Sequence, residues 1–195
     1  MSHHDHDSEY YEMVHKDYGH GARSKVSIVK RKSDGKLLIW KQPLLDDLWH
    51  HESLEKEFKY TEYWRKFGVS KVKVSWHPDK RSLLKTYIKG CTLGQMLEQN
   101  LVCFSQKSKP LKALRKFIER LITSRHYIGD VIEENIVFDG EDWHIIDSGS
   151  IKKKKSRSDT KKAYKKRFLE NWSKKLSSQD EINSLELFIN SIESK

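Results

Sequence analysis

The stretch from Ile128 to Ser150, IGDVIEENIVFDGEDWHIIDSGS, constrains the fold of this chain more than any other. Its two short apolar runs, NIVF and WHIID, are separated by the turn signal Asp139-Gly140, so the stretch predicts a small β-hairpin. Asp130 precedes this hairpin, Asn135 begins its first run, and Asp147 ends its second run. Oxygen-bearing side chains at the ends of strands could hold a hard cation, although capping of loops and turns by the same residues is the alternative.

The residues before this stretch predict four strands and one long helix. β-rich runs at 25–31 and 36–42 are separated by a Ser-Asp-Gly turn, and those at 72–76 and 82–88 by a His-Pro-Asp turn. Between the two pairs, residues 48–67 place apolar side chains close to helical spacing. The first half therefore reads ββαββ, with Lys41 in the second strand.

The second half predicts mainly helices. A short helix is expected within 89–99, and residues 110–126 carry one apolar stripe typical of a longer helix. Residues 161–176 repeat aromatic side chains at steps of four, and Ser178 with Glu181 forms a capping box for a last helix.

Length and composition fit one or two globular units. The chain has 195 residues, and its six Trp, eight Tyr and seven Phe argue against wholesale disorder. No apolar run approaches the roughly 18 residues of a membrane span, and the polar start lacks the apolar part of a signal peptide. Cys91 and Cys103 form no disulfide framework. We expect a soluble cytoplasmic protein with reduced thiols; a peripheral position at the inner face of the membrane, and secretion by a route other than Sec, stay open.

The net charge of +10 is concentrated in residues 151–175, where twelve Lys and Arg face only Asp159 and Glu170. Three interpretations stay open for this basic segment. It is a solvated helix docked by its aromatic stripe, a contact for anionic lipid or lipopolysaccharide phosphates, or a binder of another polyanion. Because no aromatic-interleaved recognition motif accompanies it, no specific nucleic-acid recognition is expected.

Candidate phosphate-binding groups occur in the first half. Gly19-His-Gly21 precedes a strand, where glycines let backbone N–H groups approach a polyphosphate, although a plain turn explains them as well. The ammonium of Lys41 could bind phosphate groups, or Lys41 could be a solvated strand residue. Glu57 could position that ammonium, although Glu52, Glu55 and Glu62 compete for the role.

The order of these pieces resembles the protein-kinase-like superfamily. Over about residues 17–151, GHGARSKV looks like the phosphate-covering loop, LLIWK the third-strand lysine motif and KEFKYTEYW the helix with the paired acid. YIKGCTLGQML looks like the hinge, IGDVIEEN the catalytic loop and IIDSG the metal-binding D-F-G segment.

This resemblance implies an α+β, two-lobed protein-kinase-like fold, with a five-stranded N-lobe and a shortened, mainly helical C-lobe. The expected divisions are a flexible tail at 1–15, the N-lobe at 16–87 and the C-lobe at 88–195, which includes the basic amphipathic segment 151–176.

The resemblance also implies ATP and Mg²⁺ as cofactors. Asp130 would be the catalytic base, Asn135 and Asp147 would bind Mg²⁺, and Lys41, held by Glu57, would contact the α- and β-phosphates. The remaining nucleotide contacts would come from the glycine loop and the hinge, at Gly19, Gly21, Ser24, Tyr87 and Ile88.

Several positions depart from the kinase pattern. Ile128 replaces the usual His, Ser148 the Phe of D-F-G, and Ser24 the third loop glycine. No Lys or Arg follows Asp130 within the loop, a charge that the lysines from Lys152 onward could supply, and there is no A-P-E motif.

This truncated layout resembles two kinds of small kinase. Gly129-Asp130 and IIDSGSIKKKK look like the bacterial lipopolysaccharide-core sugar kinases, and the short chain like the minimal kinases secreted by bacterial pathogens. The expected function is transfer of the ATP γ-phosphate to a hydroxyl acceptor, a lipopolysaccharide-core sugar or a protein Ser/Thr. The alternative is a pseudokinase that binds nucleotide or a partner and carries a polyanion-binding basic tail.

Overall fold

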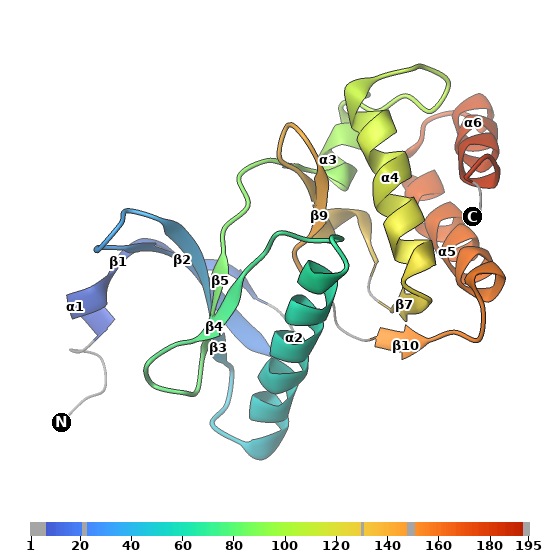
Figure 1. Cartoon of the computed structure of the whole chain (residues 1–195). Helices are drawn as coiled ribbons and strands as arrows, with labels where there is room; N and C mark the ends of the chain where they lie inside the picture. The colour runs from blue at the N-terminus through green and yellow to red at the C-terminus, as the bar shows by residue number, and fades with distance from the viewer. Residues whose placement is uncertain (1–6, 21–22, 130, 148–150, 193–195) are drawn as a thin grey trace. The chain divides into compact units, whose positions relative to one another are not determined.

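The computed structural model describes residues 7–20, 23–129, 131–147 and 151–192, and the fold is mixed α+β (Figure 1). The chain forms two compact units. Met1–Glu62 and Val72–Tyr87 make unit 1, while Tyr63–Lys71 and Ile88–Lys195 make unit 2. The expected division at 87/88 coincides with a change of unit, but residues 63–71, assigned to the N-lobe from the sequence, belong to unit 2.

Unit 1 is built on a five-stranded antiparallel sheet in the order β1-β2-β3-β5-β4. The elements of this unit are α1 (Asp7–Tyr10), β1 (Tyr11–His20), β2 (Ser24–Arg31), β3 (Leu37–Pro43), most of α2 (Leu48–Lys66), β4 (Val74–Trp76) and β5 (Leu83–Thr86). The four strands predicted from the sequence runs and the helix between them are confirmed. β1 is the fifth strand of the sheet, a number that the resemblance implied without placing this strand.

The expectation of a flexible tail at 1–15 is wrong for its last part, because β1 begins at Tyr11. β1 pairs with β2 from Tyr11 opposite Arg31 to His20 opposite Lys25, with two register irregularities on the way. Pairing satisfies backbone groups that β2 would otherwise expose at a sheet edge. Tyr11 also packs against the cluster of Val29, Leu38, Trp40 and Leu84. Residues 1–6 lie outside the described part of the chain.

Unit 2 combines helices with two small sheets. Its helical elements are α3 (Leu93–Glu98), α4 (Lys109–Thr123), η1 (Glu133–Asn135), α5 (Arg157–Trp172), η2 (Ser173–Lys175) and α6 (Gln179–Asn190). Strands β6 (Cys91–Thr92), β8 (Ile136–Phe138) and β9 (Trp143–Ile145) form one sheet, and β7 (His126–Ile128) pairs with β10 (Ile151–Lys153).

The predicted hairpin is confirmed as β8 and β9, with Ile136 opposite Ile145. Its turn is held by the Asp139 carboxylate, which accepts hydrogen bonds from the backbone N–H groups of Glu141 and Asp142, both at 2.9 Å. Gly140 has φ of 99°, a conformation that disfavours other residues. Burial opposes ionisation of Asp139, but Lys71, these N–H groups and His144 outweigh it and hold its pKa well below the usual range.

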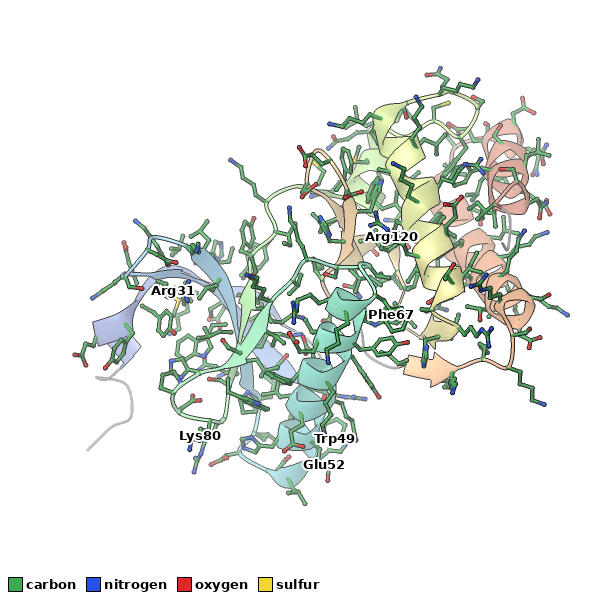
Figure 2. The ribbon with its side chains drawn as sticks, in the orientation of Figure 1. Arg31, Trp49, Glu52, Phe67, Lys80 and Arg120 are labelled. Carbon is green, nitrogen blue, oxygen red and sulfur yellow. The ribbon has the colours of Figure 1, made fainter. Side chains whose placement is uncertain are left out.

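Helix α4 forms the centre of the unit 2 core. Leu114, Phe117, Ile118 and Leu121 are almost fully buried, as their spacing predicts. The helix ends at Thr123 rather than at His126, because Arg125 adopts φ of 57° and His126 begins β7. Figure 1 shows α4 beside α5, and α4 also contacts β7 and β9. The guanidinium of Arg120, in α4, donates a hydrogen bond to the carbonyl oxygen of Gly68 at 2.9 Å. Gly68 follows Phe67, which Figure 2 labels together with Arg120.

The basic segment is docked on this core by one face. Thr160, Tyr164, Phe168 and Trp172 are buried on α5, and the rings of Phe168 and Trp172 stack at 4.1 Å between centroids. The helix begins earlier than expected, at Arg157, because Ser156 accepts a hydrogen bond from Asp159 N and caps it. This agrees with the first of the three interpretations. Lys162 and Lys166 are exposed, whereas Lys161 donates to the Ile192 carbonyl and Lys165 pairs with Glu186 of α6.

The last helix has the predicted capping box, in which Ser178 and Glu181 satisfy each other's backbone N–H groups. Within the described residues, no helix combines the length and apolar character needed to cross a membrane.

Candidate functional site

The candidate site in unit 1 centres on a buried ion pair. The Nζ atom of Lys41, in β3, donates to both carboxylate oxygens of Glu57, in α2, at 2.9 Å each. Their side chains are only 8% and 11% exposed, so water screens the attraction little. The predicted pairing of Lys41 with Glu57 is confirmed, while its role toward a nucleotide stays a prediction.

The spacing along α2 explains why Glu57 is the paired acid. Leu54, Thr61 and Trp64 are buried, and their positions three or four residues apart put Glu57 on the same face of the helix. The competitors Glu52 and Glu55 point to solvent, where each lies beside a lysine one turn away. Figure 2 shows Glu52, together with Trp49, near the start of α2.

A second lysine, which the sequence reasoning missed, joins this pair. Lys85 of β5 donates from Nζ to Glu57 Oε1 at 2.6 Å, and its side chain is 4% exposed. Lys85 lies opposite Ile39, two residues before Lys41, so strand alternation puts both ammonium groups on one face of the sheet. The sequence alone could not identify Lys85, because its position beside Lys41 depends on the β3–β5 register. One buried carboxylate thus contacts two ammonium groups.

The expected phosphate-covering loop is placed differently from the prediction. Gly19 lies within β1, opposite Val26, and not in the loop before the strand. Gly21 lies outside the described residues. Ser24 is the buried first residue of β2, opposite Pro43, so its backbone takes part in the sheet.

The two expected hinge residues follow β5. The backbone N–H of Tyr87 donates to the Leu37 carbonyl at 3.3 Å and extends the contact of this segment with β3. Burial raises the pKa of the Tyr18 hydroxyl, and the nearby Tyr87 hydroxyl acts in the same direction. Ile88 is buried and is the first residue of the second segment of unit 2.

In unit 2 the two candidate metal ligands lie at one end of the β8–β9 hairpin. Asn135 immediately precedes β8, and Asp147 follows β9 after one residue. Between them, the Ile146 N–H donates to the Asn135 carbonyl at 3.0 Å and continues the antiparallel ladder. This bond brings the backbone of Asn135 next to that of Asp147, as expected for the start of one strand and the end of its partner.

Asp130, the predicted catalytic base, lies outside the described residues, but its flanks are firmly held. Ile128 and Val131 are completely buried. The Tyr164 hydroxyl accepts a hydrogen bond from Ile128 N at 3.2 Å and donates to the His126 carbonyl at 2.9 Å. β10 pairs with the same strand and puts Ile151 opposite Ile128. Helix α5 and β10 therefore fix the strand that leads to Asp130.

The loop before Asn135 is acidic and contacts the basic segment. Burial raises the pKa of the Glu133 carboxyl, and the charge of Glu134 acts in the same direction. Lys175 of η2 lies 3.5 Å from Glu134 and 2.6 Å from Glu98. The part of the basic segment that reaches this loop is therefore η2, and Lys175 there offsets acidic charge.

The donor set of Asn135 and Asp147 fits a hard cation, because amide and carboxylate oxygens are what Mg²⁺ prefers. Among the described residues, no group of three or more His, Cys, Asp or Glu gathers in a way that could hold a metal ion. The proposed metal site therefore depends on one amide ligand, Asn135, and one carboxylate ligand, Asp147.

No protein-family model matches the chain, and no curated protein shows significant sequence similarity to it.

Proposed function

We propose that the protein is an ATP- and Mg²⁺-dependent phosphotransferase that moves the γ-phosphate to a hydroxyl acceptor, a lipopolysaccharide-core sugar or a protein Ser/Thr. The observation that carries the proposal is the buried Lys41–Glu57 ion pair. A strand lysine fixed by a helix glutamate is the arrangement with which protein kinases hold the phosphates of ATP. Because burying such a pair costs desolvation energy, the presence of the pair is weak support for a purely structural role.

The arrangement of elements supports the finer proposal of a two-lobed kinase-like fold. Unit 1 has a five-stranded antiparallel sheet with one long helix inserted between β3 and β4, and Lys41 is in the third strand. Unit 2 is mainly helical and carries the Asp130-to-Asp147 stretch. Both agree with the lobes expected from the kinase-like motifs.

Each candidate residue has one task in this proposal. Lys41, held in position by Glu57, neutralises phosphate charge, and Asn135 and Asp147 hold the Mg²⁺ ion. Bound there, Mg²⁺ would neutralise charge on the phosphate oxygens. The bond between the γ-phosphorus and the ADP oxygen breaks, and ADP is the leaving group. Asp130 orients the acceptor hydroxyl and takes its proton as the acceptor oxygen bonds to phosphorus. Positioning and charge neutralisation supply most of the catalysis in such reactions.

The competing function is a pseudokinase that binds nucleotide or a partner without transfer. The acidic loop favours it, because Glu133 and Glu134 stand where protein kinases usually place a cation near the transferred phosphate. Lys175 lies against Glu134 and only partly offsets that charge.

The test is intact-mass analysis and ADP release after incubation with Mg-ATP, alone and with lipopolysaccharide-core oligosaccharide or casein as acceptor. Wild-type protein should release ADP or add phosphate, and Asp147→Asn and Lys41→Ala should lose both. Asp130→Asn should lose transfer but keep thermal stabilisation by nucleotide. Lys59→Ala, an exposed change on α2, serves as the matched control that keeps activity.

The result also separates the two functions. Stabilisation by Mg-ATP without turnover on either acceptor would favour the pseudokinase. If nucleotide neither stabilises the wild type nor is consumed, the proposal is wrong.

We also propose that the outer side of the basic segment contacts an anionic membrane surface. Lys152 and Lys153 of β10 and Lys162 of α5 are exposed, on a segment whose aromatic face is buried. Each surface lysine adds about 1 kcal/mol of attraction to anionic lipid. Cosedimentation with phosphatidylglycerol vesicles should fall roughly tenfold or more on charge reversal of these three residues, and with added salt. Equal binding to neutral phosphatidylcholine vesicles would contradict it.

A further inference from the structure

Unit 2 has a groove that the proposed phosphotransfer does not use. It lies among the loop before α4, the first turns of α4 and the second half of α6, and has a volume of about 540 Å³. All of its described lining belongs to unit 2.

The floor of the groove is apolar. Phe104 and Phe188 contact each other with ring centroids 5.5 Å apart, and Leu111 lies beside them with 8% of its surface exposed. Leu187 also lines the groove, yet 70% of its surface is exposed. A leucine this exposed beside an apolar floor gives a binding partner apolar surface to cover.

The rim of the groove is cationic. Lys107, Lys112 and Arg115 line it, and none of its described lining residues is acidic. Arg115 is held in place, because its guanidinium donates to the Ser191 carbonyl and hydroxyl oxygens at 3.0 and 2.7 Å. It also lies 5.2 Å from the centroid of the Phe188 ring. Lys107 and Lys112 are exposed, and within the described chain neither forms an ion pair with an acidic side chain.

We propose that this groove docks an acidic peptide segment of a partner protein, which inserts one apolar side chain between the cations. Charge complementarity selects the acidic partner, since three cations line one rim without a described acid among them. The exposed Leu187 beside the apolar floor selects a peptide over a small inorganic anion, because an anion alone would leave this leucine uncovered. The docking does not depend on phosphoryl transfer, so either can fail without the other.

The test is selection of a displayed random peptide library on the full-length protein, followed by fluorescence anisotropy with the selected peptides. The expected consensus contains Asp or Glu around one Leu, Ile, Phe or Met. Lys107→Glu/Lys112→Glu should weaken binding about tenfold or more, and added salt should do the same. Leu187→Ser should weaken it without changing the salt dependence.

Controls keep the result specific to the groove. Lys116→Glu changes an exposed charge on α4 outside the groove and should leave affinity unchanged. Lys107, Lys112 and Leu187 are surface residues, so all variants should unfold at the wild-type temperature. A selection without an acidic, apolar consensus, or a consensus peptide that binds Lys107→Glu/Lys112→Glu unchanged, would overturn the proposal. Complete displacement of the peptide by millimolar inorganic phosphate would instead indicate a simple anion site and would also overturn it.

Discussion

Glu57→Gln should destabilise the protein far more than a charge change of the same kind elsewhere on α2. Glutamine is nearly isosteric with glutamate and has a similar helix propensity, so the variant removes charge with little change of shape. Lys41 and Lys85 both lose the carboxylate that they contact at 2.6–2.9 Å. The amide of glutamine can accept from one ammonium, but its NH₂ group then faces the other.

The size of the effect follows from burial. The three side chains are 4–11% exposed, and removing one partner of a buried ion pair costs about 3 kcal/mol at the low end of measured cases. For a chain of this length, that corresponds to a decrease in Tm of roughly 6–12 °C. The matched control is Glu55→Gln, whose pair with Lys59 is 3.8 Å long and more than half exposed. This pair should contribute less than about 1 kcal/mol.

Thermal and urea unfolding, followed by circular dichroism at neutral pH, measure both variants against the wild type. Adding Lys85→Met to Glu57→Gln should recover part of the loss, because one buried ammonium is then replaced by an apolar side chain. Equal Tm values for Glu57→Gln and Glu55→Gln would refute the reasoning. So would a double variant that is less stable than Glu57→Gln alone.

Three further predictions concern unit 2. Tyr164→Phe removes the hydroxyl that bridges His126 O and Ile128 N, leaves that buried N–H without its partner, and should cost about 2 kcal/mol or roughly 4–8 °C in Tm; an unchanged Tm would contradict the bridge. Asp139 has a lowered pKa, so its contribution to stability is present above the unfolded-state pKa of about 4 and is lost as the pH falls below it. Asp139→Asn should therefore lose less stability than the wild type between pH 5 and pH 3, measured by urea unfolding, and parallel pH profiles would argue against this. Ser178→Ala removes the cap of α6 and should cost about 1 kcal/mol in the same assay, whereas Ser177→Ala, just outside the capping position, should cost less.

Elements with a complete local signal could be predicted from the sequence. The β8–β9 hairpin follows from the turn residues Asp139 and Gly140, and α6 from its capping box. Helix α4 follows from one apolar stripe, although its end could not be set to better than a few residues. In each case the interactions that stabilise the element lie within a few residues of one another.

Elements that depend on distant partners were missed. β7 and β10 have three residues each, and their pairing joins residues 126–128 to 151–153. Three residues give no readable alternation, so only the tertiary contact defines these strands. β1 was missed for a related reason, because several of its side chains, including Met13 and Val14, are exposed and give no buried face to recognise.

The candidate site shows the same division. Lys41 and Glu57 could be chosen from their positions in a strand and a helix, and the heptad-like spacing of Leu54, Thr61 and Trp64 would have singled out Glu57 earlier. Lys85 could not be found, because its contact with Glu57 requires the β3–β5 register. The roles proposed for Asn135 and Asp147 likewise depend on a ladder that only the folded hairpin defines.

The division of the chain between the two units has a consequence for its synthesis. Unit 1 is complete once Tyr87 has been made, but Trp64 and Val69 belong to the core of unit 2, which includes residues as late as Ile192. During translation these two apolar side chains must wait for more than half of the protein to emerge before they are covered. The nascent chain thus exposes apolar side chains at the end of α2 until the rest of unit 2 is made, and we expect chaperones to bind there. A fragment cut after residue 87 would keep this surface permanently, and we expect it to aggregate even though all five strands of its sheet are present.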